Sequence, residues 1–271
     1  MITNFKRIDG AASRGSLFQW SYNGSVVSAF WPAGYSNVVP DVDNAATALN
    51  AGILAAGNEI AAAADRLKKT DEIHGVALEA VSRFVAAPFR YLRDRAIADR
   101  DSVGMARASL RQPVERQSAT PYSIAADSLE RQEIRRTLDQ FDQIGEAFDW
   151  VMKSTGLTVL NAIAPSIDLT IFAKDKQLAD LVQEEFAIRK TARLIDNSPD
   201  DIFATASQPL RNKADYDQIR NTAKARVGDL KVRESAVSDA EKLLIAVIAF
   251  TSQTGNISAD EAFRLLMGKS A

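Results

Sequence analysis

Arginines are the residues in this sequence whose number and spacing most suggest chemistry. Eight arginines and no lysine occur between Arg83 and Arg116. Six of them recur at steps of three, four or seven residues, which places them on one side of an α-helix: Arg83, Arg90, Arg93, Arg100, Arg107 and Arg111. A guanidinium binds carboxylates or phosphates through two parallel hydrogen bonds. The stripe therefore predicts either ion pairs between helices or an anion-binding surface.

Pairing between helices is the favoured interpretation of this stripe. The stretch from Pro121 to Lys153, which is predicted to be helical, carries seven acids against four bases. The alternative is contact with the phosphates of DNA or RNA, which the acids Asp94, Asp99 and Asp101 on the same segment would weaken. Nucleic acid is thus a secondary candidate partner.

Metal and cofactor sites are not expected. His74 is the only histidine and the chain has no cysteine, so zinc patterns and thiolate nucleophiles fail on residue count. The glycines form no dinucleotide-binding fingerprint. We therefore predict no catalytic residues, no metal and no cofactor. Because carboxylates are the only plentiful catalytic groups, a carboxylate-based hydrolase is the enzymatic alternative.

The composition is that of a globular protein with no strong overall charge. The chain has 271 residues, is 46% hydrophobic and has a formal net charge of −2, so general attraction to nucleic acid or anionic membrane is not expected. No apolar signal segment follows Met1, and the longest apolar run, Leu243 to Phe250, is too short to span a bilayer. We expect synthesis in the cytosol, without secretion or a transmembrane segment.

The sharpest local signal predicts a β-hairpin near the N-terminus. Phe18, Trp20 and Tyr22 alternate with polar residues, and Asn23-Gly24 then precedes the apolar stretch from Ser25 to Trp31. Asn-Gly suits a two-residue hairpin loop, which would pair Tyr22 with Ser25, Trp20 with Val27 and Phe18 with Ala29. The stretch from Thr3 to Ile8 is a candidate third strand.

One face of this hairpin would be aromatic and must be covered, because an isolated two-stranded hairpin is marginal in water. We predict a partner-binding surface that docks through the strand edge or through the aromatic face. In the alternative the hairpin folds back on the protein's own helices. The residues assigned to partner binding are Phe18, Trp20, Tyr22, Val27 and Trp31.

The remainder of the chain has helical periodicity, so the predicted fold is mainly α: a multi-helix bundle with long amphipathic helices, preceded by the small β-hairpin module. We place the module at residues 1–42 and the helical domain at 43–271, with sub-boundaries near 113–120 and 154–174. In the first helix Ala48, Gly52 and Ala56 are spaced four apart, which would let another backbone approach closely.

Starts and stops along the chain predict the individual helices. One begins at Asp43 or Asn44 and runs to about Lys69. The next spans residues 70–112 and should be kinked by Pro88. Further helices are expected at 121–153, 175–196, 199–206, 215–234, 238–252 and 258–267. Within 121–153 a heptad-like pattern predicts a bundle or coiled-coil seam made of Ile134, Leu138, Phe141, Phe148 and Met152.

An aromatic hairpin joined to long, well-capped helices favours an interaction protein over an enzyme. We expect a subunit of a multi-copy assembly such as a bacteriophage virion, for example a tail, portal-adaptor or internal ejected protein. Its partners would be other copies of the same chain and other proteins of the assembly. The rival classes are the nucleic-acid-associated protein that uses the arginine stripe and the carboxylate-based hydrolase.

Overall fold

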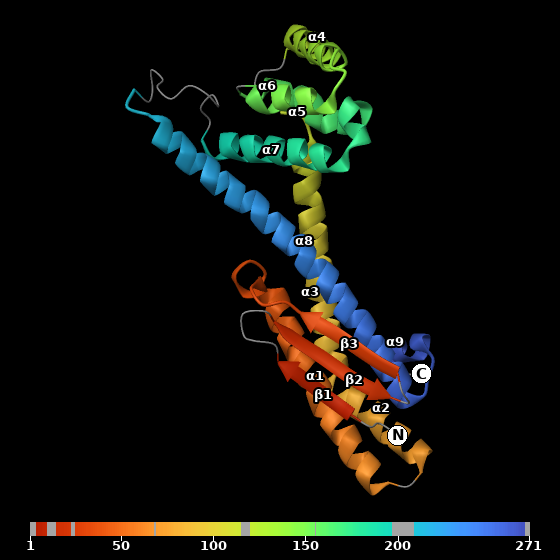
Figure 1. Cartoon of the computed structure of the whole chain (residues 1–271). Helices are drawn as coiled ribbons and strands as arrows, with labels where there is room; N and C mark the ends of the chain where they lie inside the picture. Colours follow the sequence, from red (N-terminus) through yellow and green to blue (C-terminus); the bar gives the residue numbers. More distant parts are fainter. Residues whose placement is uncertain are drawn as a thin grey trace. The chain divides into compact units, whose positions relative to one another are not determined.

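The computed structural model describes residues 4–9, 15–22, 25–67, 69–114, 120–154, 156–196 and 209–268. The protein is mainly α-helical with a small N-terminal sheet, as predicted (Figure 1). It divides into two compact units. The first is Met1–Val103 together with Lys231–Ala271, and the second is Gly104–Leu230. The prediction that residues 1–42 form a module separate from the helices stays a prediction.

The first unit contains a three-stranded antiparallel sheet in the order β1-β2-β3. The predicted pairing of the hairpin is confirmed, since Tyr22 lies opposite Ser25, Trp20 opposite Val27 and Phe18 opposite Ala29. The third strand is also confirmed, because β1 pairs with β2 along its whole length. The strands are β1 (Asn4–Asp9), β2 (Ser16–Tyr22) and β3 (Ser25–Trp31).

Helix α1 (Pro40–Arg66) follows the sheet after the short 3-10 helix η1 (Tyr35–Asn37). It begins earlier than predicted, because Pro40 takes the first helical position and Val39 is the N-cap. Proline suits that position, where its missing N–H costs no hydrogen bond and its fixed φ is already helical. Asp43, predicted as the cap, lies instead in the first turn.

The helix predicted at residues 70–112 has a one-residue break, which separates α2 (Thr70–Phe84) from α3 (Ala86–Arg111) although the backbone there stays right-handed helical. It falls at Val85, three residues before Pro88. The offset has a steric origin: a proline ring clashes with the carbonyl four residues earlier, which here belongs to Phe84. The effect of the proline therefore appears one turn before the proline itself.

One long helix, α8 (Lys213–Gly255), replaces the two helices predicted at 215–234 and 238–252. The predicted start at Ser238 is wrong, because the apolar pattern continues through it: Ala236, Ala240 and Leu243 are all buried. No proline or glycine between these residues interrupts the helix. The predicted start at Ser258 is confirmed, since Ser258 and Glu261 form a reciprocal capping box at the start of α9 (Ala259–Leu266).

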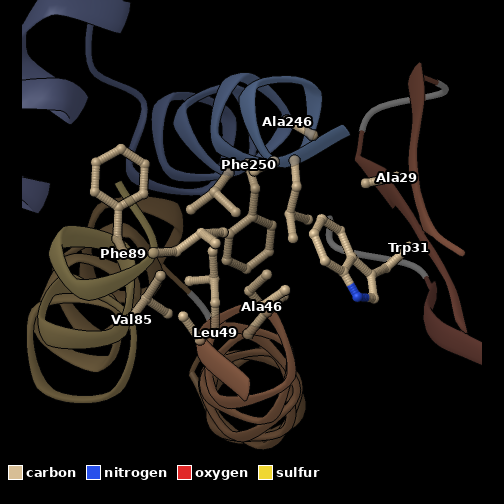
Figure 2. Close-up of a cluster of buried hydrophobic side chains, with 14 of the residues drawn as sticks. Ala29, Trp31, Ala46, Leu49, Val85, Phe89, Ala246 and Phe250 are labelled. Atoms are coloured by element: carbon tan, nitrogen blue, oxygen red, sulfur yellow. The ribbon is translucent and has the colours of Figure 1, made fainter. Parts of the chain in front are cut away.

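The core of the first unit joins the sheet to α1 and to the C-terminal part of α8. Figure 2 shows side chains from both ends of the sequence gathered in one cluster. The core includes Ala29 and Trp31 of β3, Ala46 and Leu49 of α1, Val85 and Phe89 near the α2–α3 interruption, and Ala246 and Phe250 of α8. Residues more than 200 positions apart in the sequence thus share one apolar interior.

Several helices lie wholly within the second unit, which also includes the last part of α3 and the first part of α8. They are α4 (Pro121–Leu138), α5 (Ile144–Lys153), α6 (Thr158–Ile163), the 3-10 helices η2 (Ala164–Leu169) and η3 (Ile171–Lys174), and α7 (Lys176–Ile195). The predicted starts near residues 121 and 175 are confirmed, because the side chains of the N-cap residues Thr120 and Asp175 accept hydrogen bonds from the first turn of each helix. The helix predicted at 199–206 lies outside the described residues.

The single helix predicted from Pro121 to Lys153 is wrong, because residues 139–143 separate α4 from α5. The interruption lets the chain turn so that Phe141 packs against Trp150, with ring centroids 5.7 Å apart. Four of the five seam residues gather around one core instead of forming one straight stripe, and the fifth, Met152, is half-buried. Leu138 is buried there, and Ile134, Phe141 and Phe148 are half-buried against it.

Among the described residues, no helix combines the length and the apolar character needed to cross a membrane.

Candidate functional site

Trp20 and Trp31, two of the residues predicted to bind a partner, lie in the protein's own core. They are 2% and 4% exposed. The ring of Trp20 meets Phe250 of α8 edge to face, with centroids 5.1 Å apart. The two tryptophans occupy the inner face of the sheet because strand residues alternate between faces. This is the folded-back arrangement that the sequence left open as the alternative to docking.

Polar contacts fix the end of the hairpin to two helices. The indole Nε1 of Trp31 donates to Asp43 of α1 at 2.8 Å, and Tyr35 stacks edge to face on Trp31. The Tyr35 hydroxyl donates to Asp239 of α8 at 2.7 Å. Burial, together with this carboxylate, raises the pKa of Tyr35 well above its usual value. The phenol therefore stays protonated and keeps donating to Asp239.

Of the other three residues predicted to bind a partner, the structure describes the side chain of Val27 only. Val27 is half-buried and packs against the core of the first unit. Phe18 and Tyr22 hold the expected strand positions, but their side chains lie outside the described residues. Docking of this face onto another molecule stays a prediction.

The opposite, outer face of the sheet carries apolar side chains that the sequence analysis did not select. On β3, Val26 is 58% exposed and Phe30 is 47% exposed, and Ser28 between them is also exposed. The signal was available, because Val26 and Phe30 alternate with the buried residues Ala29 and Trp31.

The predicted arginine stripe is divided between α2 and α3, and four of its residues have described partners in the first unit. Arg83 of α2 forms an ion pair with Glu59 of α1, and Arg90 donates to the carbonyl of Leu266 at 3.2 Å. Arg93 and Arg100 pair with Asp94 and Asp101, their neighbours in the sequence, at 3.4 and 3.3 Å. Arg107 is half-buried and has an interaction partner, and Arg111 is exposed at the end of α3.

The partners predicted on residues 121–153 are therefore not those found for Arg83, Arg93 and Arg100. The structure favours contacts within the first unit for these three arginines. The sequence did not predict a longer-range ion pair of α3. Asp99 of α3 binds Arg233 of α8, which also donates to the hydroxyl of Ser102 at 3.2 Å. Anion binding by the stripe stays a prediction.

A buried ion-pair network in the second unit was also missed. Arg220 of α8 donates two hydrogen bonds to Glu185 of α7, at 2.8 and 2.7 Å, and Arg189 donates a third at 2.7 Å. Burial alone would raise the pKa of Glu185, but the hydrogen bonds from both arginines bring it below its usual value. The four-residue spacing of Glu185 and Arg189 was the signal available in the sequence.

Arg189 also binds the backbone at the end of α5. Its guanidinium donates to the carbonyls of Ser154 at 2.8 Å, Gly156 at 2.6 Å and Met152 at 3.3 Å. Carbonyls at the end of a helix lack partners within the helix, and a cation there also interacts favourably with the helix dipole. The network thus joins α5, α7 and α8 within the second unit, which is a structural function.

A small cavity lies in the second unit. Its volume is about 110 Å³, and its lining combines two acids, two arginines and neutral groups: Val114, Asp127, Glu130, Arg131, Leu157, Thr158, Asn161 and Arg193. The amide of Asn161 binds both the N–H and the carbonyl of Val114, at 2.7 and 3.1 Å. The carboxylates of this cavity, Asp127 and Glu130, lie on one helix.

His74 makes a structural contact in the first unit. Its Nδ1 donates to the carbonyl of Thr254, near the end of α8, at 2.7 Å. In the part of the chain that the structure describes, no three histidine, aspartate or glutamate residues are grouped so as to hold a metal ion. No known protein family, curated protein or solved structure matches the chain significantly.

Proposed function

We propose that this protein is a non-enzymatic structural and interaction protein that works as a subunit of a multi-copy assembly. A bacteriophage virion is the kind of assembly we favour, with the chain as a tail, portal-adaptor or internal ejected protein. The observation that carries the proposal is an apolar face of α4 on which two large side chains, Tyr122 and Leu129, are exposed to solvent.

Helix α4 presents an apolar face along its first two turns. Tyr122 is 85% exposed and Leu129 is 62% exposed. They are seven residues apart, and Ala125 and Ala126 lie between them on the same side of the helix. We call these four residues the α4 apolar face. Of all the described side chains of α4, only that of Leu138, at the far end of the helix, is fully buried.

Exposure of such a face to water is unfavourable, and contact with another subunit would bury it. A helix of this length gains most of its stability from packing its apolar side, and α4 buries little of that side in its own unit. Tyrosine is among the residues that contribute most to protein interfaces. A partner helix laid along the α4 apolar face would cover Tyr122 and Leu129 together.

Light scattering on the untagged chain tests the proposal across concentration and salt. We expect a species much larger than the single chain of 29.5 kDa. L129E places a charge in the α4 apolar face and should reduce that mass. The matched control is S128E, which places the same charge at the neighbouring exposed position on the same helix. A monomer at every concentration would contradict the proposal, and equal effects of both variants would remove the α4 apolar face from it.

One observation supports association with nucleic acid as a second candidate function. Arg100 is 65% exposed, and its only described ion pair is with Asp101, its exposed neighbour in the sequence. Exposed pairs of this kind contribute little stability and can be exchanged for other anions. A phosphate backbone could therefore compete with Asp101 for Arg100. The chain's formal net charge of −2 gives no general attraction that would add to this binding.

A further inference from the structure

Strand β3 forms one edge of the sheet. In the described part of the chain it pairs with β2 only. Hydrogen-bonded and non-bonded pairs alternate along an antiparallel ladder, so every second residue of β3 turns its N–H and C=O away from β2. These backbone groups are directed to the free edge, where another strand can bind them.

The two edges of this sheet differ in their protection. Natural proteins usually protect an exposed edge with charged residues, proline or a bulge. The opposite edge strand, β1, contains Lys6, Arg7 and Asp9. Strand β3 reads Ser-Val-Val-Ser-Ala-Phe-Trp and contains neither a charged residue nor a proline. Of the two edges, the one formed by β3 therefore lacks the sequence features that block strand addition.

The sequence of β3 is complementary to itself about Ser28. In an antiparallel pair of two β3 strands centred on that residue, Val26 of each copy would lie opposite Phe30 of the other. Val27 would likewise lie opposite Ala29. Val26 and Phe30 are exposed apolar side chains on the outer face of β3. Pairs of an aromatic and a β-branched residue are favourable across strands, and the pairing brings no like charges together.

We propose that β3 binds the β3 strand of a second copy of this chain, antiparallel and centred on Ser28. The two three-stranded sheets then form one six-stranded sheet related by a twofold axis, and this contact closes on itself. The inference rests on the proposed function as a multi-copy subunit, for which it supplies one specific contact. It differs from the aromatic docking face, since Trp20 and Trp31 remain inside each copy.

A cysteine cross-link tests this contact directly, because the natural chain contains no cysteine. In the proposed pair, two copies of S28C bring their new thiols face to face, within the Cα separation of about 4.4–6.8 Å that a disulfide needs. The matched control is Q19C. Gln19 lies directly opposite Ser28 on the same face of the sheet, but on the central strand. Each variant is oxidised as the full chain and analysed on gels without reductant.

We expect S28C to form a reducible dimer in high yield and Q19C to remain largely monomeric. S28K, which would place two lysines opposite each other, should lower the mass measured by light scattering, and Q19K should not. Circular dichroism confirms that each variant is folded, and S28E, which places two carboxylates opposite each other, replaces S28K if S28K is not.

The outcomes separate this inference from the proposed function. If the natural chain is oligomeric but S28C and Q19C cross-link equally or not at all, the β3 contact is wrong and assembly uses other surfaces. If the natural chain is monomeric at every concentration, both proposals fail. Cross-linking of S28C alone, without any effect of L129E, supports the β3 contact and removes the role of the α4 apolar face.

Discussion

Gly52 of α1 lies against the carbonyl oxygen of Phe84, at the end of α2. A Cβ atom added at Gly52 would be only 2.3 Å from that oxygen, far inside van der Waals contact. In an uninterrupted helix this carbonyl would accept a hydrogen bond from residue 88, but Pro88 has no N–H. Gly52 of α1 therefore packs against the point where Pro88 breaks the hydrogen bonding between α2 and α3.

Replacing Gly52 by alanine should destabilise the first unit. The new methyl group would collide with backbone, which cannot move aside as a flexible side chain can, so we expect a loss of about 1–3 kcal/mol. Gly75 of α2 is the matched control, because a Cβ there meets nothing within 4 Å. Gly75→Ala should stabilise the protein by about 0.5–1 kcal/mol. Denaturant unfolding of both variants measures the difference, and equal effects would contradict the close approach.

Substitutions of Trp20 separate packing within the chain from docking onto a partner. Trp20 is buried, and its Nε1 has no acceptor among the described residues. Trp20→Phe should therefore lose packing but no hydrogen bond, whereas Trp20→Ser should cost about 3–5 kcal/mol. Thermal unfolding measures both. A Trp20→Ser variant that keeps its stability but loses assembly would contradict core packing and favour docking.

Glu185→Gln should destabilise the second unit at neutral pH. The change removes the negative charge that Arg189 and Arg220 bind, and it leaves these two buried or half-buried cations without a counter-charge. We expect the free energy of unfolding to fall by about 3–5 kcal/mol. Asp180→Asn, at an exposed position of the same helix, is the control and should change the free energy of unfolding little. Similar losses for the two variants would contradict a structural role for the network.

The same network should contribute to acid sensitivity. Because the pKa of Glu185 is lowered in the folded protein, unfolded chains bind a proton there at higher pH than folded chains. Its contribution is complete above the unfolded-state pKa, about 4.3, and is lost as the pH falls through the folded-state value. Denaturant unfolding between pH 7 and 3 should show a smaller pH dependence for Glu185→Gln than for the natural chain. An unchanged slope would assign the acid sensitivity to other groups.

The arginine stripe gives a prediction that distinguishes the two candidate functions. A nucleic-acid-binding protein should lose affinity when Arg93, Arg100 and Arg107 become alanine, and its binding should weaken with added salt. For an assembly protein we expect no salt-dependent binding in the first place. Fluorescence anisotropy with labelled duplex DNA and single-stranded RNA measures this. Salt-sensitive binding that the triple substitution abolishes would favour the nucleic-acid function.

Local signals in the sequence predicted what depends on local physics. The hairpin register follows from alternation and an Asn-Gly turn, and the caps at Thr120, Asp175 and Ser258 follow from side chains that bind the first helical turn. The interruption at residues 139–143 was not predicted, because no proline or glycine marks it there. It reflects packing of Phe141 against Trp150.

The candidate sites were harder to predict because they depend on contacts between residues that are far apart in the sequence. Alternation correctly placed Trp20 and Trp31 on one face of the hairpin. That Phe250 of α8 covers this face depends on a contact between distant parts of the chain. The Glu185–Arg220 pair is similar, since its residues are 35 positions apart on different helices. Spacing along the sequence cannot reveal such pairs.

The first unit is made of segments from both ends of the sequence, so it can be completed only after the last of them has been synthesised. The ribosome makes the sheet first, but Phe250, which covers Trp20, emerges about 230 residues later. At roughly 5–20 residues per second, the aromatic face of the sheet waits on the order of 10–50 s for its cover. The second unit is one continuous segment and can fold within that interval. Newly made chains thus expose, for a time, an apolar surface that the finished protein hides.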